Sequence, residues 1–270
     1  MNSTGERKSL TFIDFFAGAG GIRRGFELAG HKCVGFCEWD KYATMSYVSM
    51  HLLTDEQREY LAKLPKRERQ KEILKSEYRN GEWYADDIRT VHAADLPRAD
   101  VWCFGAPCQG FSIAGKRKGL DDDRSSLVRE IFRLLDETSD RGLYRPGWLF
   151  YENVTGMLSS NKGFDFLAIL LEMDKRGYDA EWQILDTQHF GVPQHRERVF
   201  TIGCLREKRA KKVLPIGNDE EATSHVQRQS VCNTLKSSHH VVGIYPTDVV
   251  RGGRAVVLRV NGFHKEKLLN

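Results

Sequence analysis

Short apolar runs alternate with amphipathic stretches along the first 204 residues of the chain. The runs that are typical of strands cover residues 10–16, 33–37, 100–104, 148–151, 181–185 and 199–204. Between them, apolar residues recur at helical spacing near residues 23–29, 127–135 and 166–173, and Gly177 follows the last of these where a helix would end. Strands that alternate with helices predict an α/β fold with a mostly parallel sheet.

Two other segments have a different character. Residues 54–82 are dense in charges of both signs and predict solvated helical segments, broken near Pro65, that form an insertion beside the core. Their Lys and Arg side chains fit a nucleic-acid surface or a solvated face, and the mixed charge favours the solvated face. Beyond residue 204 the periodicity weakens. We therefore predict a domain over residues 1–204 and the start of a small second lobe over residues 205–270.

Composition narrows the class of protein. Hydrophobic residues make up 40% and charged residues 29% of the chain, as in soluble globular proteins. No apolar run approaches the roughly 18 residues of a membrane span, and no signal peptide precedes the first charges, so we expect a cytoplasmic protein. The net charge of +4 permits a nucleic-acid partner without requiring one. Six cysteines without a CxxC pair argue against a zinc site or a disulfide framework, and we predict no metal.

Ligands of open parallel sheets bind outside the carboxyl ends of the strands, so the residues that follow each strand are the candidates. FAGAGG, residues 16–21, follows the first strand, and Arg23 stands where a dinucleotide-binding loop needs its third glycine. A nicotinamide cofactor is therefore a distant alternative. Glu38 at the end of the second strand can accept hydrogen bonds from ribose hydroxyls. Trp39 can stack on a purine, or it can pack in the core.

Four further segments hold candidate side chains. ADDIRTV begins at residue 85 and offers Asp87 and Ile88 to an adenine. GAPCQGFS, residues 105–112, holds Cys108 behind Pro107, either as a nucleophile or as a buried structural cysteine. Glu152, placed after the strand at 148–151, is a candidate proton donor or a surface carboxylate. The fourth segment holds three alternating polar residues, Gln194, Arg196 and Arg198, which share one face if the segment is extended. Such a face suits phosphate or the edge of a base, or it is the solvated basic face of an edge strand.

Together these motifs resemble the C5-cytosine-specific DNA methyltransferases of the bacterial restriction-modification type. FAGAGG, EWD at 38–40, GAPCQGFSIAGKRKG, ENV at 152–154 and QHRER at 194–198 occur in the order and near the spacing of that family, over residues 10–204. The resemblance implies a Rossmann-like fold that uses S-adenosylmethionine. It also implies methylation of a cytosine flipped out of double-stranded DNA, by a monomer that protects host DNA from a restriction enzyme.

The resemblance also assigns roles to individual residues. It implies cofactor contacts from Phe16, Gly18, Gly20, Gly21, Glu38, Trp39, Asp87, Ile88 and Pro107. It implies catalytic roles for Cys108, which would add to cytosine C6, for Glu152 at N3 and N4, and for Arg198 at O2. It implies DNA contacts from Ser112, Lys116, Arg117, Lys118, Gln194 and Arg196.

The C-terminal part departs from the family pattern. The family's later G-N-A/S-V motif has no counterpart here, since Gly217 and Asn218 are followed by Asp219. We therefore expect a chain that is C-terminally short, and a companion chain that supplies the missing motif is one explanation. Two alternatives to an active DNA methyltransferase stay open: a tRNA cytosine C5 methyltransferase, and a truncated, inactive DNA-binding relic.

Overall fold

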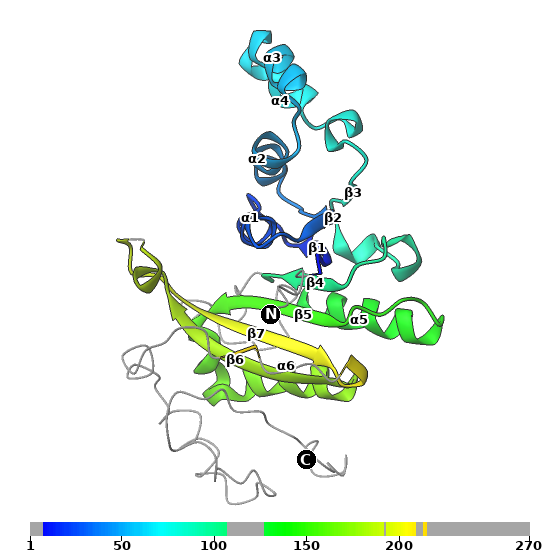
Figure 1. Cartoon of the computed structure of the whole chain (residues 1–270), viewed down its shortest axis with the longest axis vertical. Coiled ribbons are helices and arrows are strands. Elements are labelled where there is room, and N and C mark those ends of the chain that lie inside the picture. Colours follow the sequence, from blue (N-terminus) through cyan, green and yellow to red (C-terminus); the bar gives the residue numbers. More distant parts are fainter. Residues whose placement is uncertain (1–7, 107–126, 192, 209–212, 215–270) are drawn as a thin grey trace, which may run out of the picture. The chain divides into compact units, whose positions relative to one another are not determined.

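The computed structural model describes residues 8–106, 127–191, 193–208 and 213–214 (Figure 1). Its strands form a seven-stranded mixed sheet in the order β3-β2-β1-β4-β5-β7-β6. The chain divides into two compact units, and in the described part the first contains residues 8–106 and 127–149 and the second the remainder. The predicted α/β fold with a mostly parallel sheet is confirmed.

Four parallel strands form the centre of the first unit. They are β1 (Thr11–Phe15), β2 (Lys32–Cys37), β3 (Trp83–Ala85) and β4 (Val101–Phe104). Phe15 lies opposite both Cys37 and Phe104, and Cys37 lies opposite Ala85, so all four strands end at one edge of the sheet. The loops that follow them, which hold most of the predicted cofactor residues, therefore begin side by side.

The described part of this unit also contains helices. They are α1 (Gly21–Leu28), α2 (Lys41–His51), α3 (Asp55–Lys63), α4 (Lys66–Glu72) and α5 (Leu127–Asp140), with the 3₁₀ turns η1 (Ser76–Arg79), η2 (Ile88–Thr90) and η3 (Ala93–Asp95). α5 is amphipathic and buries one apolar face, as its periodicity predicts.

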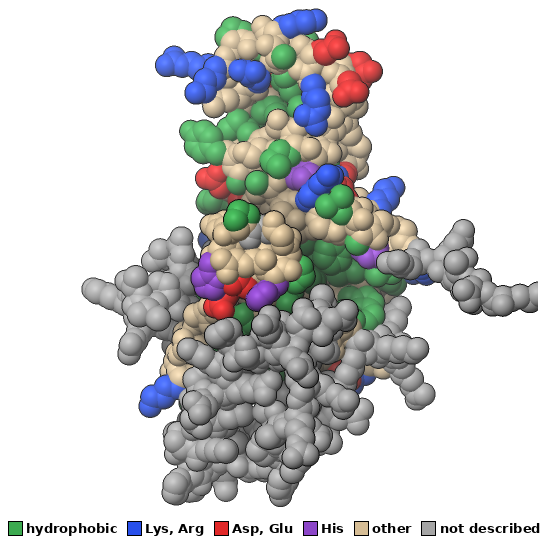
Figure 2. Space-filling view, turned by 60° about the vertical axis from the view of Figure 1, so that its left-hand side comes forward, with side chains coloured by type: hydrophobic (Ala, Val, Ile, Leu, Met, Phe, Trp, Pro, Cys, Tyr) green, Lys and Arg blue, Asp and Glu red, His purple; other side chains and the backbone are tan. Residues whose placement is uncertain are grey.

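The charged insertion at 54–82 is helical, as predicted. Thr54 and Gln57 form a capping box at the start of α3, and Pro65 separates α3 from α4. Leu61 and Tyr78 are buried in a cluster with residues of β2 and α2, which attaches the insertion to this unit. Figure 2 shows Lys and Arg side chains together with Asp and Glu side chains around the end that carries α3 and α4. Such a mixture of positive and negative side chains is typical of a solvated face.

The second unit begins within β5 (Trp148–Val154), whose first two residues belong to the first unit. It continues with η5 (Thr155–Leu158), η6 (Ser160–Gly163), α6 (Phe164–Lys175), β6 (Tyr178–Asp186), η7 (Thr187–Phe190), β7 (Glu197–Leu205) and η8 (Arg206–Lys208). β6 and β7 form an antiparallel hairpin. Gly177 follows α6 with a φ of +83°, so the predicted helix end is confirmed.

Three sequence-based strand assignments need correction. Glu152 lies inside β5 rather than after it, because the alternation of buried and half-buried residues continues to Val154. β6 begins three residues before its predicted start. β3 was not among the predicted strands, since its three residues are too few to show an alternating pattern.

The boundary predicted at residue 204 falls at the end of β7. Leu205 is the last residue of that strand, and the backbone amides of Val213 and Leu214 donate to the Glu181 carboxylate at 2.7 and 3.2 Å. The predicted lobe beyond residue 214 lies outside the described residues. Within the described part, none of the helices is both long and apolar enough to cross a membrane.

Candidate functional site

The glycine loop between β1 and α1 has a constrained backbone. Phe16, Gly18 and Gly20 all have positive φ, at +57°, +56° and +85°. A Cβ atom on Gly20 would lie 2.4 Å from Nε2 of His51, so only glycine fits there. Phe16 adopts this conformation without being glycine, and such backbone strain is concentrated at functional sites.

Glu38 connects this loop to the one that follows β2. Its Oε2 accepts a hydrogen bond from the Gly18 amide at 2.7 Å, and its Oε1 accepts one from the Asp40 amide at 2.7 Å. Each carboxylate oxygen has further acceptor capacity for a ligand hydroxyl. Trp39 is 68% exposed, so the interpretation that it packs in the core is wrong. The Arg89 guanidinium lies over its ring, 5.0 Å from the centroid.

Asp87 offers a fixed anionic acceptor after β3. Its carboxylate accepts hydrogen bonds from the Arg89 side chain at 2.8 to 3.1 Å and from the Arg89 backbone amide at 3.0 Å. These bonds to Arg89 hold the pKa of Asp87 below its usual range. Ile88, the other predicted adenine contact, is buried at 3% exposure. It therefore supports the turn from beneath rather than presenting an open apolar surface.

Asp14, on β1 just before the glycine loop, is an unusual member of the core. Its side chain is completely buried, and burial raises its pKa to about 8. The nearby Arg23 amide and guanidinium partly oppose that rise, but neither completes a hydrogen bond with the carboxyl group. The sequence pattern did not single out this residue, because it lies within an apolar run.

Arg23 occupies the position where a dinucleotide-binding loop would have its third glycine. It is buried, and its guanidinium donates to both carboxylate oxygens of Glu82 at 2.7 and 2.8 Å and to Glu27 at 2.8 Å. It also donates to the Tyr47 hydroxyl at 3.2 Å. Arg23 therefore connects α1 to the segment before β3, whereas the third glycine of a dinucleotide-binding loop serves close packing of the helix on the strand.

The thiols of the described core are poor nucleophiles. Burial raises the pKa of Cys33 and of Cys37 to about 12, and it raises the pKa of Cys103 as well. A thiol needs a lowered pKa to react as the thiolate. The predicted nucleophile Cys108 lies outside the described residues, as do the predicted site residues Pro107, Ser112, Lys116, Arg117 and Lys118.

In the second unit, Glu152 of β5 and Arg198 of β7 form an ion pair, with Nε of Arg198 2.9 Å from Oε1 of Glu152. Both side chains are about one quarter exposed, at 25% and 22%. Two residues earlier on β5 and two later on β7, the rings of Phe150 and Phe200 are in contact at 5.7 Å. The structure thus joins two predicted site residues that are 46 positions apart in the sequence.

Gln194 and Arg196 precede β7 instead of sharing its strand with Arg198. Both are exposed, and the Arg196 amide donates to Oδ1 of Asp186 at 3.1 Å. The sequence interpretation of one extended segment fails here because the strand begins only at Glu197.

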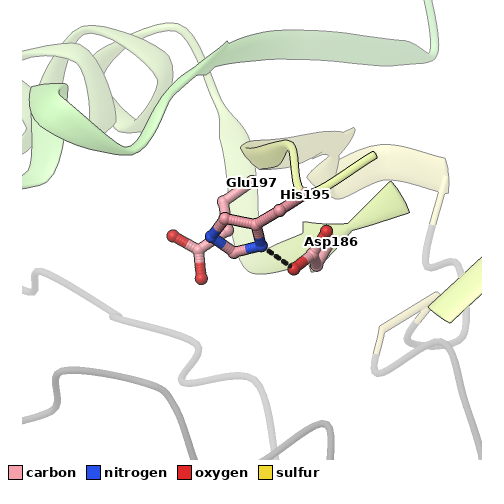
Figure 3. Close-up of side chains that lie close together, drawn as sticks. All are labelled: Asp186, His195 and Glu197. Atoms are coloured by element: carbon pink, nitrogen blue, oxygen red, sulfur yellow. Dashed lines mark hydrogen bonds and ion pairs between the residues drawn. The ribbon is translucent and has the colours of Figure 1, made fainter. Parts of the chain in front are cut away.

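Asp186 organises this end of the hairpin. Its Oδ2 lies 2.5 Å from Nδ1 of His195, and its Oδ1 also accepts from the Gln188 amide at 3.1 Å (Figure 3). Asp186, His195 and Glu197 could each offer a ligand atom to a metal ion, since these atoms lie within 4.8 Å of one another. No CxxC pair marks this cluster in the sequence, but Asp186 ends a strand, where ligands of such sheets gather.

Known proteins are similar to this chain over most of its length. The type II methyltransferase M.BsuFI of Bacillus subtilis is 36% identical over 194 residues, which cover 72% of this chain and 39% of that protein. M.HaeII of Haemophilus aegyptius is 33% identical over 224 residues, 83% of this chain and 59% of that protein. The chain therefore spans about half the length of the curated relatives it matches.

A solved structure supports the fold. The S. pombe Dnmt2 methyltransferase superposes with a TM-score of 0.53 at 21% identity, over 82% of this chain and 57% of that one. The model of the family described as C-5 cytosine-specific DNA methylase matches residues 10–250, which include both groups of site residues. On this evidence the chain belongs to the C-5 cytosine-specific DNA methylase family.

Proposed function

We propose that the chain is the catalytic part of a DNA (cytosine-5)-methyltransferase that uses S-adenosylmethionine. The observation that carries this proposal is the contact between Glu152 and Arg198 in a chain that matches the family over residues 10–250. The names of the relatives, type II methyltransferases, support a role in restriction-modification.

The residues of the first unit fit the cofactor. Glu38 keeps acceptor capacity for two ribose hydroxyls, the exposed Trp39 ring is available for stacking, and Asp87 is an oriented acceptor for the adenine amine. The amides and small side chains of residues 16–21 allow close approach of the methionine part. When bound, S-adenosylmethionine supplies the methyl group.

Glu152 and Arg198 would act on the target cytosine. As a carboxylate, Glu152 accepts a hydrogen bond from the exocyclic amine, and when it carries a proton it donates to N3. Charge that builds on the ring during nucleophilic addition is stabilised by such a donor. Arg198 fixes the orientation of Glu152 through the ion pair, and its remaining N–H groups are donors for the ring oxygen O2.

Cys108 would provide the nucleophile. Addition of its thiolate to C6 makes C5 electron-rich enough to accept a methyl group, and loss of the C5 proton followed by elimination of the thiolate restores the aromatic ring. The high pKa values of Cys33, Cys37 and Cys103 leave these thiols unsuited to the step. Because the ring faces are covered inside a duplex, the cytosine has to leave the stack first.

Double-stranded DNA is the proposed partner of a monomeric protein. Lys116, Arg117 and Lys118 follow the nucleophile closely in sequence and would contact phosphates, with Ser112 beside them. The exposed Gln194 and Arg196 would contact the DNA from the end of the β6–β7 hairpin.

Transfer of labelled methyl groups from S-adenosylmethionine to duplex DNA tests the proposal, with Cys108→Ala as the control. We expect label in DNA from the wild-type chain and none from the variant. Equal counts from both would rule the proposal out. A parallel reaction with tRNA decides the alternative substrate, since the tRNA proposal requires label in tRNA and none in DNA.

A further inference from the structure

The turn that carries Asp87 is fixed by hydrogen bonds at both of its ends. The Asp87 carboxylate accepts from the Arg89 amide at 3.0 Å, and the Asp87 carbonyl accepts from the Thr90 amide at 3.1 Å and hydroxyl at 2.9 Å. The Ile88 carbonyl accepts from the Val91 amide at 3.2 Å. A turn of three residues has few internal bonds, so contacts from outside decide how rigid it is.

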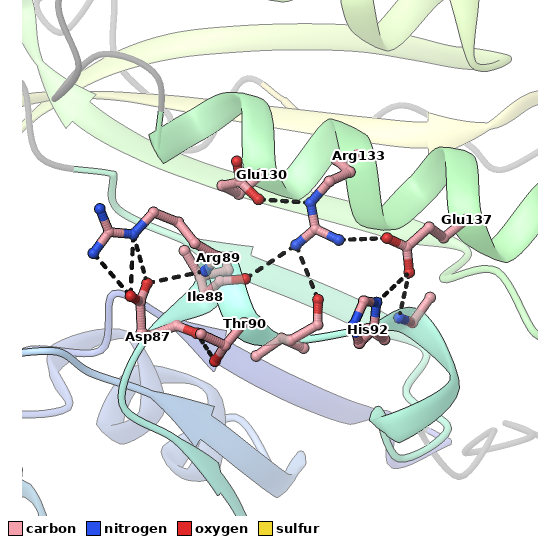
Figure 4. A network of polar contacts seen from close by, with 10 residues as sticks. Asp87, Ile88, Arg89, Thr90, His92, Glu130, Arg133 and Glu137 are labelled. Carbon is pink, nitrogen blue, oxygen red and sulfur yellow. Dashed lines mark hydrogen bonds and ion pairs between the residues drawn. The ribbon is translucent and has the colours of Figure 1, made fainter.

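Arg133 of α5 supplies such contacts (Figure 4). Its Nη2 donates to the Ile88 carbonyl at 3.1 Å and to the Val91 carbonyl at 2.9 Å. One planar guanidinium thus holds the first residue of η2 and the residue after its last. Arginine is suited to this role, because it presents several donors in a fixed plane.

Two carboxylates hold Arg133 in place. Glu130 accepts from its Nε at 2.6 Å, and Glu137 accepts from its Nη1. The other oxygen of Glu137 accepts from the Ala93 amide at 2.9 Å, so the same carboxylate also holds the start of η3. These side chains are 19 to 32% exposed, and the network joins α5 to both turns with hydrogen bonds assisted by charge.

We infer that Arg133 is a positioning residue for the cofactor: it holds the η2 turn so that Asp87 meets the adenine of S-adenosylmethionine. The inference rests on the proposed function. Arg133 acts through the carbonyls of Ile88 and Val91 and reaches Asp87 only through the turn. Its loss therefore weakens cofactor binding and leaves the chemistry of the methyl transfer alone.

Binding of S-adenosylhomocysteine to the full chain, measured by calorimetry, tests the inference. For Arg133→Met we expect a dissociation constant at least tenfold higher, equivalent to about 1.4 kcal/mol. Arg133→Lys keeps the charge but cannot make all four contacts, so its dissociation constant falls between those of the wild type and Arg133→Met. Arg129→Met, an exposed arginine on the same helix, is the matched control and should bind as the wild type does. In the enzyme assay, the KM for the cofactor rises in Arg133→Met while kcat is little changed.

Hydrogen exchange without any cofactor separates positioning from general stability. In Arg133→Met we expect faster exchange confined to η2, η3 and the residue that follows η2, at the amides of Thr90, Val91 and Ala93. Exchange that is faster throughout α5 and β1–β4 would assign Arg133 a purely structural role and overturn the inference. Unchanged binding of S-adenosylhomocysteine by Arg133→Met would also overturn it. If the wild-type chain itself fails to bind, the proposed function falls and takes the inference with it, whatever the variant does.

Discussion

Asp14 places an ionisable group inside the core behind the glycine loop. Burial raises its pKa to about 8 from 3.8, so between these values the folded chain holds a proton that the unfolded chain has released. The free energy of unfolding therefore falls as the pH rises from about 4 to about 8. Asp14→Asn cannot ionise and should lose this part of the slope. Urea unfolding at pH 5 and pH 8 measures the change in the free energy of unfolding between the two pH values. An equal change in the wild type and in Asp14→Asn would contradict the account.

Gly20 and Gly25 make a matched pair, one at the start of α1 and one inside it. Gly20→Ala forces a Cβ against His51 at a positive φ and should destabilise the fold by about 1–3 kcal/mol. Gly25 is exposed with open space around it, and Gly25→Ala should stabilise the fold by about 0.5–1 kcal/mol. Chemical denaturation compares the two variants. Equal effects would mean that the glycine loop tolerates side chains.

Glu152→Gln separates catalysis from stability. The pair with Arg198 is partly solvated, so we expect a loss of less than about 1 kcal/mol in the free energy of unfolding. The proposed proton donation would be lost, and methyl transfer should fall by roughly a hundredfold or more. Rates and unfolding curves from the same preparation give both numbers. A variant that is strongly destabilised yet fully active would show that the pair is structural.

Some of the site residues could be predicted from their position at the end of a strand, and others could not. Glu38 and Trp39 could be predicted because they follow a strand that the sequence pattern shows, and the register of β1–β3 brings their loop and that of Asp87 to one edge. Arg133 could not be found in this way, because a lone arginine on an amphipathic helix has many ordinary uses. Only the hydrogen bonds to Ile88 and Val91 reveal its connection to the site.

Among the elements, the β6–β7 hairpin depends on Asp186. Burial alone would raise the pKa of this carboxyl, but hydrogen bonds from the Gln188 and Arg196 amides and from His195 outweigh it and leave the pKa lowered. Ionised Asp186 therefore stabilises the folded chain at pH values above the ordinary pKa of aspartate, and this stabilisation is lost as the pH falls through the lowered pKa. Asp186→Ala should speed exchange of both amides and weaken DNA binding.

Cofactor binding provides the internal control for that variant, since Asp186 belongs to the second unit and the proposed cofactor residues belong to the first. Asp179→Ala, on the same strand but paired with Arg206, is the matched control. If the wild type and Asp186→Ala bind DNA with equal affinity, the end of the hairpin has no part in DNA recognition.

Elements with a long periodic pattern were predictable from the sequence, and short or irregular ones were not. α5 and α6 follow from repeats of apolar residues over several turns, and Pro65 marks the break between α3 and α4. Strand ends were displaced by up to three residues, at Glu152–Val154 and at the start of β6. Polar residues can continue a strand wherever the neighbouring strand pairs with them.

At the scale of the whole molecule, the sequence pattern alone could not predict which side chains from distant segments contact one another. The resemblance to the family gave Glu152 and Arg198 related roles, and the structure adds their contact at 2.9 Å. In the same way, the identity of Arg23 made a nicotinamide-binding loop a distant alternative, whereas its hydrogen bonds to Glu82 and Tyr47 show what the side chain does instead.

The most direct test of the central claim is the capture of the covalent intermediate. The wild-type chain, duplex DNA with 5-fluorocytosine and S-adenosylmethionine are mixed, and the product is digested and examined by mass spectrometry. Fluorine takes the place of the C5 proton and cannot leave as a cation, so the thiolate is not eliminated and the adduct persists. The account predicts a cytosine adduct on the peptide that contains Cys108, and none with Cys108→Ala. An adduct on another cysteine, or none at all, would contradict it.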